Sequence, residues 1–276
     1  MALLSRNASR RELPYWLIAA VLLAVAFGLV IFSSAGYAVI FSAVASGIGV
    51  TVFVTIIAYS LACLLGLGVA MAQLSHHRVL RQMAIFYVEI IRGVPLLVLL
   101  FYMAFVAAPA LVALWNILTT PLQSLGLVEP ALVRDFSLMW RAVVSLVIAY
   151  SAFLAEIFRA GLQSVDHGQI EAAKALGLSR WPVFRLIILP QAFRTVLPPL
   201  GNDFVSMIKD SSLVSVLGVQ DVTQLGKVYS SGTFLFFETY NVVAYVYLLM
   251  TVSLSLGVRS LERRLQRYRE ETGGGA

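Results

Sequence analysis

Long uncharged stretches are the feature that most restricts how this chain can fold. Residues 15–35 carry no charge, and neither do residues 47–74. A helix needs about 20 apolar residues to cross ~30 Å of hydrocarbon, so each stretch can span a bilayer. Of the 276 residues, 60% are hydrophobic and 12% are charged. This composition is too apolar for a soluble globule or a disordered chain and predicts an all-α polytopic membrane protein.

Four further stretches are long and poor in charge, which brings the expected number of transmembrane helices to about six. They are about 83–107, 140–162, about 197–219 and 239–259. The stretch at 15–35 can also be interpreted as a signal peptide. Its apolar core, however, exceeds the 7–15 residues of such peptides, and its Ser-Ser-Ala-Gly end is a weak cleavage site. We therefore expect a retained N-terminal helix.

The positions of lysine and arginine predict the orientation. With residues 1–14 in the cytoplasm, the cytoplasmic segments hold 14 Lys and Arg residues, against Arg134 and Lys227 outside. Positive charge accumulates on the cytoplasmic side of membrane proteins, so both termini are expected there and the formal net charge of +6 does not imply nucleic acid. The cytoplasmic segments are 1–14, 75–82, 163–196 and 259–276.

The remaining segments add three expectations. Residues 108–139 are predicted to hold a short interfacial or re-entrant helix bounded by Pro109 and Pro121, and residues 266–276 a flexible tail. The single cysteine, Cys63, and three scattered histidines offer no disulfide and no metal cluster.

The longest cytoplasmic loop, residues 163–190, has the signals of two short helices. Asp166 is a suitable N-cap for a helix over 167–176, and Gly177 a suitable residue to end it. Ser179 can cap a second helix with Pro182 in its first turn, and Pro190 is expected to stop it. Apolar residues at helical spacing give each helix one apolar face: Ile170, Ala173 and Leu176 in the first, and Trp181, Phe184, Ile187 and Ile188 in the second. One hypothesis is that both helices rest on the membrane surface.

The same loop contains a spaced motif: Glu171-Ala172-Ala173, then Gly177 after three residues, then Ile187-x-Leu189-Pro190 after nine. This motif resembles the EAA loop of permease subunits of binding-protein-dependent ABC importers. Other segments resemble the polar amino acid branch, of the histidine, glutamine, arginine and glutamate type. They are Arg92-Gly-x-Pro-Leu-Leu, Gly168-Gln, Leu189-Pro-Gln-Ala, Pro198-Pro-Leu-Gly-Asn and Lys209-Asp-Ser-Ser-Leu.

The resemblance covers roughly residues 41–265 and implies a type I importer fold without the helix at 15–35. It implies that the loop at 163–190 docks on a cytoplasmic ATPase subunit, and that ATP hydrolysis there drives alternating access. The implied coupling residues are Gly168, Glu171, Ala172, Ala173, Gly177, Leu189 and Pro190. The chain departs from the family at Phe153, where Tyr is usual, and at Leu99, where Gln is usual; both are pore-side positions in the family.

Ionisable residues within the membrane mark either internal pairs or a polar pathway. Glu89 with Arg92, and Glu156 with Arg159, are three residues apart and can pair on one helix face. Lys209 and Asp210 can likewise form pairs between helices. The alternative is contact with a zwitterionic substrate, whose ammonium needs an acceptor and whose carboxylate needs a donor. The candidates for that pathway are Arg92, Glu156, Asp203, Lys209, Asp210 and Ser211, near a helix entry that Pro198-Pro199 is expected to break.

The family resemblance also defines the expected partners. They are an ATPase subunit dimer carrying ATP and Mg, a second permease subunit, an extracytoplasmic solute-binding protein and membrane lipid, in a bacterial cytoplasmic membrane. The chain lacks G-x-x-x-x-G-K-[ST] and any catalytic residue set, so we expect neither an enzyme nor a cofactor of its own. The alternatives are a gradient-driven secondary amino acid transporter, which internal repeats would favour, and an intramembrane enzyme, which no motif favours.

Overall fold

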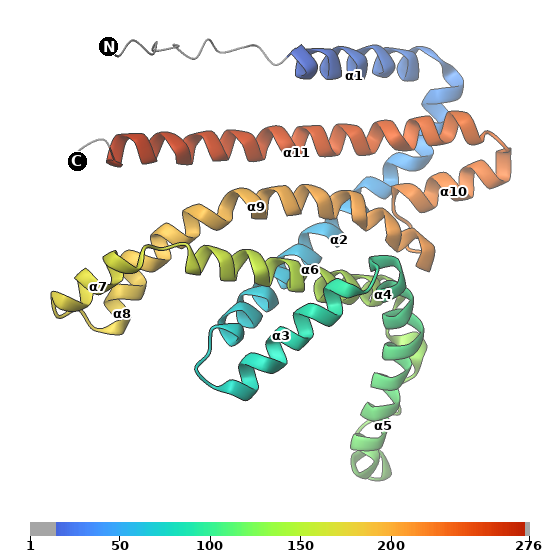
Figure 1. Cartoon of the computed structure of the whole chain (residues 1–276). Helices are drawn as coiled ribbons and strands as arrows, with labels where there is room; N and C mark the ends of the chain where they lie inside the picture. Colours follow the sequence, from blue (N-terminus) through green and yellow to red (C-terminus); the bar gives the residue numbers. More distant parts are fainter. Residues whose placement is uncertain (1–14, 274–276) are drawn as a thin grey trace, which may run out of the picture.

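The chain forms a bundle of long helices with shorter helices at both ends (Figure 1). This computed structural model describes residues 15–273, with side chains described between residues 19 and 260. Every regular element in that range is helical, as the sequence predicted. The cytoplasmic segment expected at 1–14 lies outside the described residues.

Two helices cover the N-terminal third, α1 (Tyr15–Ser33) and α2 (Ala35–Gln73). They are separated by Ser34 alone, whose backbone is extended at φ −100° and ψ 119°. Residues 36–46, which lie between the two apolar stretches, are helical and belong to α2. They contain no proline or charge that would end a helix, so α2 begins twelve residues before the apolar stretch at 47–74.

The predicted span at 83–107 is wrong as a single helix, because the chain turns within it. Helix α3 (Arg78–Gly93) ends before Val94, which is extended at φ −100° and ψ 130°. A residue before proline disfavours the helical region, and Pro95 follows. The chain resumes as α4 (Leu96–Tyr102), a π-helical turn η1 (Met103–Ala107) and α5 (Ala108–Ser124).

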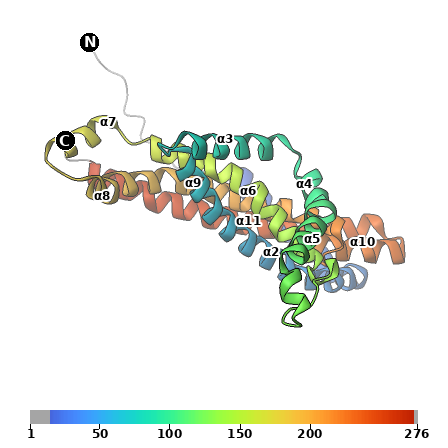
Figure 2. The ribbon, with the colours of Figure 1, turned by 90° about the horizontal axis from the view of Figure 1, so that it is seen from below.

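Helix α5 projects from the bundle across the direction of the long helices (Figures 1 and 2). Pro109 lies in its first turn, but Pro121 lies inside the helix, not at its end. The expectation of a separate short helix within 108–139 was wrong, because α5 continues α4 and η1 in one apolar helical stretch, Leu96–Ser124, that is long enough to cross a membrane. A 3₁₀ turn η2 (Val133–Asp135) follows. The buried guanidinium of Arg141 holds this region together, because Nη1 donates to the Ala104 carbonyl at 3.0 Å and Nε to the Phe136 carbonyl at 2.7 Å.

The core lies between α2 and α6 (Leu138–Gln163). Small residues allow the two backbones to approach closely, as is common between membrane helices. A Cβ on Gly66 would lie 2.9 Å from the Ser151 carbonyl oxygen. Ala58, Ala62, Leu146 and Leu154 are fully buried around this contact.

A continuous helical path leads from the loop at 163–190 into the bundle. After α7 (His167–Ala175), it is built from α8 (Arg180–Val183), the π-turn η3 (Phe184–Ile188), α9 (Leu189–Asp210) and the 3₁₀ turn η4 (Ser211–Leu217). The predicted helix end at Pro190 and the break at Pro198-Pro199 were both wrong.

The prolines are accommodated in two ways. The π-turn precedes Pro190, just as η1 precedes Pro109, and its wider turn leaves room for the ring. Pro198 and Pro199 release the carbonyls of Arg194 and Thr195, and both of those residues are exposed, so water can satisfy the released groups.

The C-terminal part contains a helix that the sequence did not predict, α10 (Val222–Thr233), followed by α11 (Phe236–Gly273). Helix α11 covers most of the tail expected at 266–276. It ends at the same end of the molecule as α7 and α8 (Figures 1 and 2). Within the described residues, five helical stretches are long and apolar enough to cross a membrane: Ala35–Gln73, Leu96–Ser124, Leu138–Gln163, Arg180–Leu217 and Phe236–Ser260. Helix α1 adds a shorter apolar stretch at Val21–Ile31.

Candidate functional site

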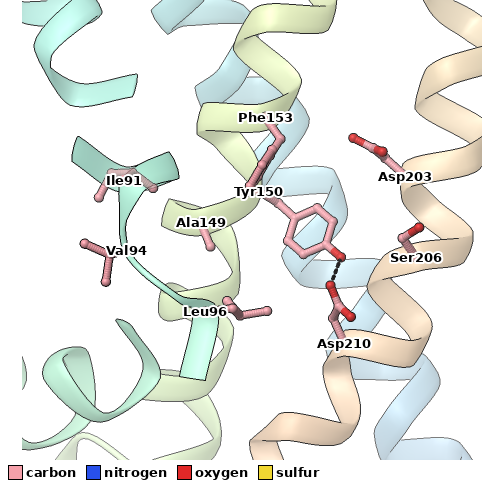
Figure 3. A pocket seen from close by; sticks show the side chains of 9 residues that line it. All are labelled: Ile91, Val94, Leu96, Ala149, Tyr150, Phe153, Asp203, Ser206 and Asp210. Carbon is pink, nitrogen blue, oxygen red and sulfur yellow. Dashed lines mark hydrogen bonds between the residues drawn. The ribbon is translucent and has the colours of Figure 1, made fainter. Parts of the chain in front are cut away.

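A cavity of about 240 Å³ lies where the α3–α4 junction faces α6 and α9 (Figure 3). Its wall from α3 and α4 is apolar, whereas α9 contributes carboxylates and a hydroxyl. The interruption of the helix at Val94 therefore leaves space beside two long helices. The lining residues are Ile91, Val94, Leu96, Ala149, Tyr150, Phe153, Asp203, Ser206 and Asp210.

The polar side of the cavity carries two carboxylates, of which one is hydrogen-bonded and the other is not. Tyr150 donates its hydroxyl to Asp210 Oδ2 at 2.7 Å. Asp203 points toward the same space from about two helical turns earlier on α9 (Figure 3), and no hydrogen bond or ion pair to it is found within residues 15–273. A half-buried carboxylate without a partner can accept hydrogen bonds from a cationic ligand group.

Arg92 lies beside this cavity and does not form the pair that its spacing suggested. Its guanidinium carbon lies 5.6 Å from the centroid of the Phe153 ring, a cation–π distance. Glu156 and Arg159 form an ion pair, whereas the expected pair of Glu89 with Arg92 is not found among the described residues. Arg92 thus contacts the ring of Phe153, which lines the cavity, and does not line the cavity itself.

Glu156 is engaged in the pair that its spacing predicted. Arg159 donates to it from Nη2 and also from Nε, the latter at 3.3 Å. Gln73 on α2 adds a hydrogen bond of 3.1 Å from Nε2 to Glu156 Oε1. Glu156 is not among the cavity-lining residues, and it joins α2 to α6.

Two other candidates lie apart from the cavity. Lys209 is exposed, and no ion pair of Lys209 with another helix is found in the described part of the chain, whereas Asp210 is bound by Tyr150 of α6. Ser211 is fully buried and donates to the Ile208 carbonyl at 2.7 Å. Leu99 is buried in the core.

Helix α7 is capped at both ends as the sequence predicted. Asp166 Oδ1 accepts a hydrogen bond from the Gly168 amide at 2.6 Å. At the other end, Gly177 has φ +81°, its amide donates to the Lys174 carbonyl at 2.9 Å, and the Leu178 amide donates to the Ala173 carbonyl at 3.1 Å. This pair of bonds is the Schellman motif, which fixes where the helix ends.

One side of α7 packs and the other is free. Ala173 is 4% exposed, and Gln191 Nε2 donates to Gln169 Oε1 at 2.6 Å, which ties α7 to α9. Gly168, Glu171 and Ala172 are exposed. The expected apolar face holds only in part, because Leu176 is 83% exposed and Trp181 66%.

Leu189 and Pro190, the last residues of the loop motif, are exposed at the start of α9. They belong to the continuous helix and not to a turn. The loop motif therefore comprises a free helix followed by the base of a long one.

Sequence reasoning did not include Tyr150 and Ser206 among the cavity residues. Their signal was present in the spacing. Asp203, Ser206 and Asp210 recur at intervals of three and four residues, which places them on one face of a helix. Tyr150 and Phe153 are likewise three residues apart on α6.

Comparisons with known proteins agree with this arrangement. Residues 62–267 match the family described as the binding-protein-dependent transport system inner membrane component. The probable amino-acid permease protein YxeN of Bacillus subtilis is 36% identical over 221 residues, which is 79% of this chain and 89% of that protein. The glutamine transport system permease protein GlnP of Escherichia coli K12 is 34% identical over 220 residues, 80% of this chain and 91% of that protein.

Solved structures show the same likeness. An amino acid ABC transporter crystallised with histidines matches with a TM-score of 0.68 and 35% identity, covering 85% of this chain and 98% of that one. The MetNI methionine ABC transporter matches with a TM-score of 0.60 and 18% identity over 81% of this chain and 96% of that one, which shows a shared fold. The chain therefore belongs to the binding-protein-dependent transport system inner membrane components, as a multi-pass permease subunit of the amino acid ABC transporter type.

Proposed function

We propose that this chain moves a polar amino acid into the cytoplasm by alternating access, driven by ATP hydrolysis on a separate subunit. The observation that carries the proposal is helix α7, a capped helix whose Glu171 and Ala172 are exposed at one end of the bundle. In this proposal that face docks on an ATPase subunit, which holds the ATP and Mg.

The continuous helix from Arg180 to Leu217 connects the docking end to the cavity. Helix α7 is bonded to its base through Gln169 and Gln191, and Asp203 and Asp210 lie further along the same helix. A displacement of α7 is therefore transmitted to the cavity carboxylates. The ATPase shifts the population of the two states only if it contacts them differently, and the exposed face of α7 is where such contacts form.

A zwitterion requires an acceptor and a donor. In our proposal Asp203, which lines the cavity, accepts from the ammonium group, and Arg92, which lies beside the cavity against Phe153, receives the carboxylate. Two relatives are named for amino acids and for glutamine. In our proposal a second permease subunit completes the pathway, an extracytoplasmic binding protein delivers the substrate, and the location is a bacterial cytoplasmic membrane.

The coupling role is tested with Glu171→Lys in the assembled transporter in vesicles. We expect the permease to assemble normally and ATP-dependent uptake to fall at least about tenfold, because a docking carboxylate becomes a repelling cation. Glu129→Lys makes the same charge change in an exposed residue outside α7 and should leave uptake unchanged. Normal uptake by Glu171→Lys would remove α7 from the coupling interface.

The cavity role is tested separately with Asp203→Asn. We expect the apparent KM for the amino acid to rise about tenfold or more while ATP hydrolysis stays coupled, because the amide cannot balance an ammonium charge. An unchanged KM would exclude Asp203 from the site. Uptake by the permease alone, driven by an ion gradient without an ATPase, would instead favour the secondary transporter.

A further inference from the structure

A second, larger hollow lies on the surface between the end of α2 and the start of the α8–η3 helix. Its volume is about 940 Å³, near the upper end of the ~300–1,000 Å³ typical of small-molecule sites. We name it the α2–α8 groove. It is lined by Gly68, Met71, Ala72, Leu74, Ser75, His76, His77, Leu80, Leu162, Arg180, Phe184 and Ile188.

The α2–α8 groove is amphipathic along its length. Apolar side chains from α2, α6 and η3 form most of it, among them Met71, Leu162 and Phe184. The polar members gather at the end of α2 and in the turn after it, Ser75, His76 and His77, with Arg180 opposite on α8. One end of the groove is thus hydrocarbon-like and the other carries hydrogen-bond donors.

The polar end has the charge of an anion site. Arg180 is exposed, and no carboxylate lines the groove. No hydrogen bond or ion pair to the Arg180 side chain is found within the part of the chain that the structure describes. The ligand that suits this end is an anion, because a guanidinium binds phosphate through several donors at once.

The level of the groove in the membrane identifies the class of that anion. Trp181 is 66% exposed and stacks on Phe184, with the ring centroids 5.9 Å apart. Tryptophan prefers the boundary between headgroups and hydrocarbon. Leu64 and Leu67, earlier on α2, are exposed and suited to lipid tails. The groove therefore extends from hydrocarbon to headgroup level.

We infer that the α2–α8 groove binds an anionic phospholipid, with its phosphate at Arg180, His76 and His77 and an acyl chain along Met71, Phe184 and Ile188. Basic pockets between membrane helices recognise lipid headgroups in this way. Because α8 and η3 form one wall, the bound lipid braces the base of α7. The inference does not depend on transport.

The experiment uses the permease assembled with its ATPase subunit in nanodiscs. Trp16, Trp115 and Trp140 are replaced by Phe, and the ATPase subunit and the nanodisc scaffold are used in tryptophan-free form, so that Trp181 alone reports. Nanodiscs contain either brominated phosphatidylglycerol or brominated phosphatidylcholine in an otherwise unlabelled phosphatidylcholine background. Both leaflets carry the probe, so the result is independent of orientation. We expect phosphatidylglycerol to quench Trp181 at a lower mole fraction than phosphatidylcholine.

Two variants and one control decide the outcome. Arg180→Gln should reduce the preference for phosphatidylglycerol about fivefold, as expected for one cation at a membrane surface. The double change His76→Gln with His77→Gln, on the opposite wall, should weaken it as well. Arg185→Gln removes an exposed cation of η3 that does not line the groove, and should leave the preference intact.

The inference fails if both lipids quench equally, or if Arg185→Gln reduces the preference as much as Arg180→Gln, which would indicate general surface attraction. It also fails if adding the ATPase subunit to the permease alone abolishes quenching by both lipids. That result would identify the groove as a protein interface.

Discussion

Helices α7 and α10 lie at opposite ends of the bundle (Figure 1) and begin with the same device. Asp166 accepts from the Gly168 amide at 2.6 Å, and Asp221 accepts from the Gln224 amide at 2.8 Å. Asp166 is exposed, whereas Asp221 is 0% exposed. One cap is therefore local, and the other is part of the packed protein.

The surroundings of Asp221 show the difference. Its second oxygen accepts from the Tyr247 hydroxyl at 2.9 Å, which brings α11 to the cap. The Val222 amide donates to Thr51 Oγ1 at 3.4 Å, which brings α2. Helix α10 is thus fixed by its cap and by two other helices, α2 and α11, whereas α7 is held by its own caps and by one side-chain hydrogen bond to α9. A helix of the first kind resists displacement, and one of the second kind can follow a partner.

The largest loss of stability should come from adding a side chain where α2 and α10 approach each other closely. A Cβ on Gly47 would lie 2.5 Å from the Val222 amide nitrogen and 2.6 Å from the Asp221 carbonyl carbon. Because both atoms belong to the backbone, Gly47→Val must separate the helices. We expect a loss of about 3 kcal/mol or more, measured as reduced thermal stability in detergent.

Gly49 provides the matched control on the same helix, because a Cβ there meets nothing within 4 Å. Gly49→Ala should keep or slightly raise the stability. Equal losses for both variants would mean that α2 simply needs glycine, and that the contact with α10 is unimportant.

A smaller effect is expected from removing the buried cap. Asp221→Ala leaves the Gln224 amide and the Tyr247 hydroxyl without their acceptor, at a cost of about 2 kcal/mol or more in unfolding free energy. Asp166→Ala removes the corresponding cap of α7 and should cost about 1 kcal/mol, confined to that helix. Thermal stability combined with hydrogen exchange of the two helices separates these outcomes. Similar global losses would contradict the comparison.

The carboxylate of Asp221 also gives the stability a pH dependence. Burial raises the pKa of Asp221 above its ordinary value, although hydrogen bonds from Gln224, Tyr247 and Thr223 oppose the shift. The folded state therefore favours the protonated form, and stability decreases as the pH rises from about 4 through the raised pKa. Asp221→Asn keeps the cap and should remove this decrease. A parallel decrease in the Asn variant would assign it to another group.

The smallest effect on stability is expected at the free end. Gly177 has φ +81°, which costs a β-branched residue about 1–2 kcal/mol. Gly177→Val should loosen the end of α7, leave global thermal stability nearly unchanged and reduce ATP-dependent uptake. Gly177→Asn, which tolerates this backbone conformation better, should retain more uptake. Equal uptake by both variants and the parent would show that the helix end has no role in coupling.

The same comparison explains what the sequence could predict. Helix α7 was predicted with its caps because Asp166 and Gly177 act on their own neighbours. Helix α10 was missed because its contacts with Thr51 and Tyr247 come from distant parts of the chain. The apolar stretches predicted the long helices, but not that π-turns would carry helices through Pro109 and Pro190.

Charge within apolar sequence selected Asp203 and Asp210 as candidates for the substrate pathway; both line the cavity, and their contact with a substrate stays a prediction. Charge alone could not distinguish these two residues from Lys209 and Ser211, because it does not tell in which direction each side chain leaves the helix. Successive helical residues point about 100° apart, so the neighbours of Asp210 face elsewhere. The Tyr150 partner belongs to another helix and needed the tertiary structure.

The π-turn at Met103–Ala107 has a consequence for how related chains can vary in length. It contains one residue more than an α-helical turn would need, and the Ala104 carbonyl there receives Arg141. Because the wider turn accommodates that extra residue, deleting it would restore regular winding and leave the direction of α5 nearly unchanged, whereas a deletion within a regular α-helix rotates everything after it by about 100°. Related chains can therefore lose one residue at this turn and still present the exposed leucines of α5 on the same side.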